Sequence, residues 1–175
     1  GNHYNITNFG ISGSTVLTHS TRPFIKTSSF LSSLNFLPQY VILQFGTNDA
    51  RLEYWNQTQF IFDYIHLIHQ YQFLSSKPTV WICTPPPFYG NLSLWAVQGS
   101  VVNTVLPKLI PHIAEIAGRG VVNNFNVLGG SSLTRPHLFS AQRNTRDDID
   151  MDSSDIERNK EKKRDKQTEI ETEKE

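Results

Sequence analysis

The stretch VILQFGTNDA, residues 41–50, joins an apolar run to a sudden cluster of glycine, amide and carboxylate. Such a run is typical of a buried strand. Its abrupt end in polar groups is typical of the carboxyl edge of a parallel sheet, where open α/β folds bind their ligands. The stretch therefore predicts a strand that delivers Asn48 and Asp49 to a binding edge.

Segments 4–10, 79–84 and 120–127 have a strand-like composition similar to that of 40–46, and helical patterns separate them. Strands that alternate with helices favour a parallel sheet. We therefore expect an α/β domain.

Two amphipathic helices are predicted between the later strands. The apolar residues of the first are Ile61, Tyr64, Ile65, Ile68 and Phe73, and those of the second are Val102, Leu106, Leu109, Ile113 and Ile116. Asn56 or Thr58 suits the N-cap of the first helix. Pro107 and Pro111 remove backbone donors from the second, so we expect a kink or break near Leu106 and an end at Gly118.

Charge divides the chain in two. Residues 1–140 carry 7 basic and 4 acidic side chains, whereas residues 141–175 carry 9 basic and 12 acidic ones and no aromatic residue. A segment of the second kind cannot bury a core, so we predict a domain over 1–140 and a disordered, low-complexity tail over 141–175. The net charge of zero favours no nucleic-acid partner.

The compartment stays open between secreted and cytoplasmic. No signal peptide and no apolar run of about 18 residues is visible, so no membrane span is expected. Sequons at Asn5, Asn56 and Asn91 suit a secreted protein. Cys83 is the only cysteine, and its place in TVWIC predicts a buried strand position.

Two further features of the sequence are candidate sites. His66 and His69 have the i, i+3 spacing of a helical metal pair, but without a third ligand nearby we interpret them as a solvated helix face. The segment TPPPFYG, 84–90, cannot continue a strand, so it predicts a rigid loop on the same edge as Asn48.

The stretch NFGISGSTVL, 8–17, contains the first candidate donor. Gly13 lets the backbone approach a ligand and present an N–H, although such turns also serve as ordinary connections. Asn48 adds a side-chain amide on the same edge. Two convergent donors of this kind make an oxyanion hole.

With these two motifs the sequence resembles the SGNH hydrolases, also called GDSL-type esterases and lipases. GISGST resembles the second block of the family, with Gly13 as its glycine, and FGTND resembles the third, with Asn48 as its asparagine. The stretches KPTVWICTPPPFYGN and IPHIAEIA look like the branch related to carbohydrate acetylesterases. The resemblance covers roughly residues 4–139.

This resemblance implies a serine esterase on a three-layer, flavodoxin-like fold. Gly13 N–H and Asn48 Nδ2 would join the N–H of the nucleophile as the oxyanion donors, and Asp49 would hold the turn. No metal or organic cofactor is implied. The substrate would be a small-molecule or carbohydrate ester, with acetyl as a candidate acyl group.

The chain departs from the family at the other catalytic residues. The first block, which carries the nucleophilic serine, would precede residue 4 and is not in this chain. With Leu138 and Phe139 in register, Ala141 and Asn144 stand where the fifth block has its aspartate and histidine. Ser14 with His137 is a conceivable replacement, but nothing in the sequence orients His137.

Three interpretations follow. The first is an esterase domain that is incomplete, and inactive as this chain. The second is a non-catalytic module that binds a glycan or a protein, with four aromatic residues that could stack on sugars: Trp55, Phe88, Tyr89 and Trp95. The third is a fragment that folds poorly, because the missing first strand would lie between segments 4–10 and 40–46.

Overall fold

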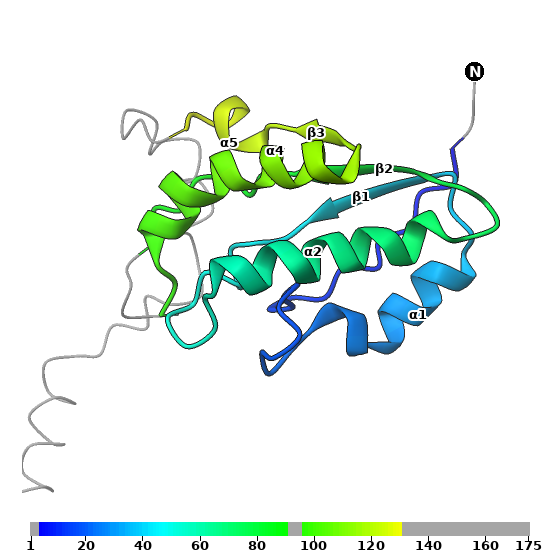
Figure 1. Ribbon diagram of the computed structural model, residues 1–175, viewed down its shortest axis with the longest axis horizontal. Helices are drawn as coiled ribbons and strands as arrows, with labels where there is room; N and C mark the ends of the chain where they lie inside the picture. The colour runs from blue at the N-terminus through cyan, green and yellow to red at the C-terminus, as the bar shows by residue number, and fades with distance from the viewer. Residues whose placement is uncertain (1–3, 91–95, 131–175) are drawn as a thin grey trace, which may run out of the picture. The chain divides into compact units, whose positions relative to one another are not determined.

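The computed structural model describes residues 4–90 and 96–130, which belong to one compact unit (Figure 1). Trp95, His137, the boundary predicted at 140 and the tail from 141 lie outside these ranges. Among the described helices, none combines the length and the apolar character that crossing a membrane requires.

Three parallel strands form the sheet, in the order β1-β2-β3. They are β1 (Tyr40–Gln44), β2 (Thr79–Cys83) and β3 (Gly120–Val122). Tyr40 pairs with Thr79, and Trp81 pairs with Gly120. The predicted α/β class and parallel sheet are confirmed.

The prediction of a strand at 4–10 was wrong. The structure has no strand there, and the local bond from Gly10 N to Asn8 Oδ1 (2.8 Å) turns the chain instead. A strand is stable only when a neighbour satisfies its backbone groups, and no described strand lies beside this segment.

The prediction of a strand over 120–127 was right only at its start. The strand ends at Val122, and a short helix, α5 (Asn124–Val127), follows. The Asn123 side chain accepts a bond from Asn126 N (3.0 Å). Asparagine is a strong N-cap, so it begins a helix where the apolar pattern alone suggested a longer strand.

The helices before β2 include the first predicted crossover helix. A 3-10 turn, η1 (Phe24–Lys26), leads into α1 (Ser28–Asn35), and α2 (Gln57–Gln72) connects β1 to β2. Asn56 caps α2 by accepting a bond from Gln59 N (3.0 Å), which decides between the two predicted caps.

The second crossover changes its winding where the prolines predicted a break. A π-helical turn, η2 (Val101–Val105), passes into α4 (Leu106–Ala117). Pro107 lies in the first turn of α4, where a missing N–H costs little. Gly118 ends α4 in the left-handed conformation, with φ of 61°.

Helices α2 and α4 contact each other and pack on the same face of the sheet (Figure 1). On β1, Val41 and Leu43 are buried on that face, whereas Tyr40 and Ile42 are 60% and 71% exposed. Parallel sheets usually have both faces covered. The described residues cover only one.

Gly46 offers a test of how closely the turn after β1 packs against α4. Its φ is 122°, and a Cβ there would lie 2.7 Å from Leu106 Cδ1. We expect Gly46→Ala to lower the free energy of unfolding by about 2–4 kcal/mol, because strain and overpacking add. Urea denaturation measures this change.

Gly118→Ala is the matched control, because φ there is 61° and a Cβ would contact nothing within 4 Å. It should cost only about 1 kcal/mol. Equal losses in the two variants would show that the contact between Gly46 and Leu106 is not tight.

Candidate functional site

The carboxylate of Asp49 joins two loops that are far apart in the sequence. Its Oδ1 accepts bonds from Val16 N (2.8 Å) and Leu17 N (2.9 Å), and its Oδ2 accepts one from Gly46 N (3.1 Å). Asp49 is fully buried. The predicted role of Asp49 in holding the turn is confirmed.

Burial also changes the acidity of this group. Desolvation raises the pKa of Asp49 from 3.8 to about 6, even though the bonds from backbone N–H groups favour the charged form and lower it. Ionising the carboxyl group that joins the two loops therefore costs free energy in the folded chain.

The turn that contains Gly13 lies within reach of Asn48. Ser14 N donates to Ile11 O (3.2 Å), and Gly13 has φ of 78°, as at the third position of a type II turn. Asn48 Nδ2 donates to Ser14 O (3.0 Å). The structure thus brings the amide of Asn48 to the residue that follows Gly13.

Ser14 is not prepared to act as a nucleophile in the described residues. Its side chain is buried, and its Oγ donates to Ile11 O (2.8 Å), a backbone carbonyl that cannot take up a proton. A serine nucleophile needs a base within hydrogen-bond reach. The suggested base, His137, lies outside the described residues.

Two of the described histidines have a polar partner that is not a metal ligand site. His19 Nε2 lies 3.0 Å from Tyr54 O, and His112 Nδ1 lies 3.6 Å from Glu115 Oε2. His66 and His69 lie along α2. Within residues 4–90 and 96–130, no group of three or more histidine, cysteine, aspartate or glutamate side chains is placed to hold a metal.

Cys83 is buried, as predicted, and burial raises the pKa of its thiol. A raised pKa keeps the thiol protonated and therefore unreactive.

The loop 84–90 after β2 is fixed by a side chain that the sequence did not reveal. Asn103 Oδ1 accepts from Phe88 N, and Asn103 Nδ2 donates to Phe88 O, both at 2.8 Å. Asn103 belongs to η2, fifteen residues from Phe88. No local sequence signal predicts these bonds, because only the tertiary fold brings the two residues together.

Two of the aromatic residues suggested as sugar platforms contribute to the core instead. The rings of Trp55 and Phe60 pack at a tilt with their centroids 5.4 Å apart, and Phe88 packs against the core. Tyr89 is 38% exposed, and its hydroxyl donates to Gly130 O (3.0 Å). Trp95 lies outside the described residues.

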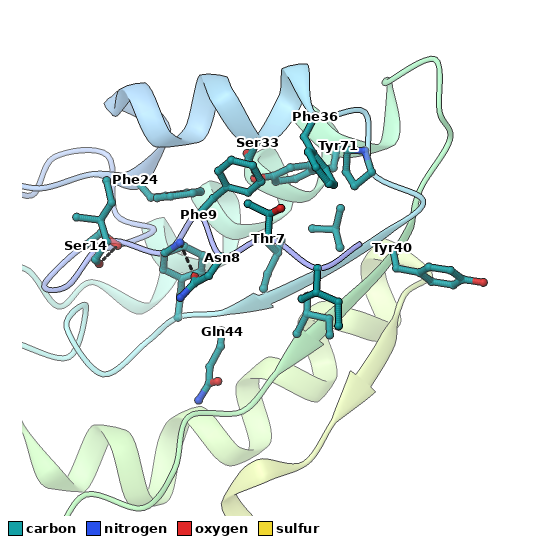
Figure 2. A pocket seen from close by; sticks show the side chains of 18 of the residues that line it. Thr7, Asn8, Phe9, Ser14, Phe24, Ser33, Phe36, Tyr40, Gln44 and Tyr71 are labelled. Atoms are coloured by element: carbon teal, nitrogen blue, oxygen red, sulfur yellow. Dashed lines mark hydrogen bonds between the residues drawn. The ribbon is translucent and has the colours of Figure 1, made fainter. Parts of the chain in front are cut away.

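A groove runs along the outer edge of β1 and ends at the candidate site (Figure 2). Residues 4–11 form one of its banks, and residues 36–48 form the other. Its volume is about 1310 Å³, and its lining includes Ser14 and Asn48. The site therefore opens directly into this groove.

The chain is similar to an acetylxylan esterase of Xylanibacter ruminicola, with 22% identity over 141 residues. The alignment covers 70% of this chain and 29% of that protein, so the chain spans less than a third of the relative's length. No protein-family model matches the chain, and no solved structure matches it. These findings relate an α/β chain with a parallel sheet distantly to an esterase.

The raised pKa of Asp49 predicts a distinctive pH dependence of stability. Between about pH 4 and 6 the folded chain keeps a proton on Asp49 that the unfolded chain has released. Stability from this group is therefore complete below pH 4 and is lost as the pH rises through 6, by roughly 3 kcal/mol. Asp49→Asn should lack this fall in urea denaturation.

Asp63→Asn is the control, because Asp63 also accepts a backbone bond, from Thr18 N (2.8 Å), but leaves Asp49 intact. It should keep the fall seen in the unmodified chain. If Asp49→Asn showed the same slope as the unmodified chain, Asp49 would not be the titrating group.

Proposed function

We propose that this chain is part of a carboxylic ester hydrolase of the SGNH type, with Gly13 N–H and Asn48 Nδ2 as oxyanion donors. The bond from Asn48 Nδ2 to Ser14 O carries the proposal, because it holds an amide donor beside the turn of Gly13. The motifs GISGST and FGTND and the distant similarity to an acetylxylan esterase support it. A flavodoxin-like arrangement of the complete sheet belongs to the same proposal.

The contact with Ser14 also explains how Asn48 serves as a donor. An amide nitrogen carries two hydrogens. One of them bonds Ser14 O, which fixes the orientation of the amide and points Nδ2 toward the turn. The second hydrogen is then available to an oxyanion without reorganisation, which is the basis of transition-state stabilisation in acyl transfer.

The nucleophile and its base come from outside residues 4–130 in this proposal. Ser14 is excluded by its bond to Ile11 O. In the complete hydrolase a serine attacks the acyl carbon, the donors bind the negative oxygen of the tetrahedral intermediate, and water releases the acid. The chemistry calls for no metal or organic cofactor.

The substrate class proposed is an ester of a small acyl group, with an acetylated carbohydrate as the first choice. The relative's name refers to acetylxylan, and the stretches KPTVWICTPPPFYGN and IPHIAEIA resemble the branch related to carbohydrate acetylesterases. The glycan-binding alternative is not favoured, because Trp55 and Phe88 are engaged with the core.

An external nucleophile allows the donors to be tested without the serine. With imidazole present, we expect the chain to accelerate p-nitrophenyl acetate cleavage saturably, by at least about tenfold over imidazole alone, because a working oxyanion hole retains catalytic power without its nucleophile. Asn48→Ala should abolish this acceleration. Absorbance of p-nitrophenolate gives both rates.

Two further variants test whether the effect depends on the donor of Asn48. Asn48→Asp replaces the donor with an acceptor of the same shape and should be equally inactive. Asn35→Ala changes an exposed amide at the end of α1 and should leave the rate unchanged. An acceleration that survives in Asn48→Ala, with the fold intact by circular dichroism, would refute the proposed role of Asn48.

A further inference from the structure

Helix α2, which covers one face of the sheet (Figure 1), presents a stripe of aromatic side chains to solvent. The members of this stripe, at spacings of four, three and four residues, are Phe62, His66, His69 and Phe73. At 3.6 residues per turn, these spacings place all four within an arc of about 60° on one side of the helix. Phe62 and Phe73 are 65% and 83% exposed, His66 is exposed and His69 is half-buried. We call this set the α2 stripe.

The second half of the stripe is held by local contacts. Phe73 follows the last residue of α2, and its N–H donates to His69 O (3.2 Å), which continues the helical winding. The rings of His69 and Phe73 meet edge to face with their centroids 6.1 Å apart. His66 Nε2 lies 3.4 Å from Gln70 Nε2, a long contact at the surface. Both imidazoles are therefore open to a further ligand.

The stripe takes no part in the packing of α2 on the sheet. The buried residues of α2 lie on its other side: Phe60, Asp63, Tyr64, Leu67, Ile68 and Tyr71. Among the described phenylalanines, Phe62 and Phe73 are the most exposed. The solvent face of a surface helix usually carries charged residues, but the only acidic or basic side chain of α2 is Asp63, which is buried. An uncharged face with two exposed rings indicates a surface that another molecule covers.

The order of the stripe is the same in both directions. Positions 62 and 73, like positions 66 and 69, lie at equal distances from the midpoint of the stripe. A symmetric dimer places one patch against itself, so each residue must suit the residue that it meets. When two copies of α2 pack antiparallel, Phe62 of one copy faces Phe73 of the other, and His66 faces His69. The occupant that fits the stripe is therefore a second copy of this chain.

Apolar contact alone is too small to hold such a dimer. A helix of 16 residues is about 24 Å long and about 10 Å wide. Its exposed face is therefore smaller than the roughly 800 Å² that each partner buries in a stable interface. The four imidazoles at the centre of the antiparallel pair offer a further source of free energy, because imidazole suits Zn²⁺ and four ligands complete its tetrahedral shell.

We propose that two copies of this chain pack antiparallel through the α2 stripe and bind one Zn²⁺ with His66 and His69 of both copies. One copy supplies two ligands and no third, since no group of three or more such side chains is placed to hold a metal within residues 4–90 and 96–130. The site is therefore complete only in the dimer. The phenylalanine pairs cover the two ends of the site and limit the access of water to the metal.

Sedimentation velocity of the full chain tests the assembly. We expect a monomer in EDTA and a dimer with Zn²⁺, because the metal supplies the free energy that the apolar contact lacks. Calorimetric titration should saturate at one Zn²⁺ for every two chains. A dimer that persists in EDTA, a chain that stays monomeric with Zn²⁺, or saturation at one Zn²⁺ per chain would overturn the proposal.

Substitutions of the histidines locate the metal. His66→Ala and His69→Ala should each abolish the dimer that depends on Zn²⁺, because each removes two of the four ligands from the pair. His112→Ala is the matched control, since His112 is also exposed on a helix, 3.6 Å from the Glu115 carboxylate, and it should leave the dimer unchanged. A dimer that survives in His66→Ala, or that is lost in His112→Ala, would place the metal elsewhere and overturn the proposal.

Charges introduced at the phenylalanines test the antiparallel direction. Phe62→Glu should raise the dissociation constant of the dimer at least about tenfold, because a carboxylate would then be buried against a phenylalanine ring. Adding Phe73→Lys should restore the dimer, because the introduced charges of opposite sign meet only in the antiparallel arrangement. Ile116→Glu, at an exposed apolar position of α4, is the control and should have no effect.

Circular dichroism checks the fold of each variant. If the double variant dimerised as weakly as Phe62→Glu alone, or if Ile116→Glu weakened the dimer equally, the antiparallel contact through the α2 stripe would be refuted. None of these measurements involves an ester, so their outcome is independent of the proposed function.

Discussion

The carboxylate of Asp49 accepts hydrogen bonds from Val16, Leu17 and Gly46, and this set of bonds fixes the geometry of the candidate site. Residues 46–49 leave β1 and would otherwise be an ordinary connection. Because Asp49 points inward to those donors, its neighbour Asn48 is held where its amide reaches Ser14 O. The packing of Gly46 against Leu106 then ties the same turn to α4.

Ionising Asp49 in this arrangement costs free energy. Burial opposes the charge on Asp49 more strongly than the backbone donors favour it, so the pKa rises to about 6. Perturbed carboxylates of this kind concentrate at functional sites, although structural networks also produce them. Here the carboxylate holds the turn of residues 46–49 and does not itself face a ligand, since it is fully buried.

The sequence predicted the local features of the fold well. Asn56 as a cap, the break near Leu106 and the end at Gly118 depend on residues within a few positions of each other. The strand at 4–10 failed because a strand depends on a neighbour, which no local pattern reveals. The predicted strand at 120–127 was too long, because Asn123 caps a helix and the apolar residues that follow it belong to that helix.

The site required more than local signals. Gly13 and Asn48 were expected to share an edge because each follows a predicted strand, one of which the structure lacks, and the resemblance to a family implied their roles. The contact between Asn48 and Ser14 spans 34 positions, and the bonds between Asn103 and Phe88 had no sequence signal at all. The groove beside β1 was foreseen only as the gap that a missing strand would leave.

The central claim is that Gly13 N–H and Asn48 Nδ2 donate hydrogen bonds to the same ligand atom. Titration of the ¹⁵N-labelled chain with the monoanion of ethyl methylphosphonate, which has the shape and charge of a tetrahedral acyl intermediate, tests it by nuclear magnetic resonance. The account predicts that the backbone signal of Gly13 and the side-chain signal of Asn48 shift together with one dissociation constant. Movement of only one signal, or two different constants, would contradict it.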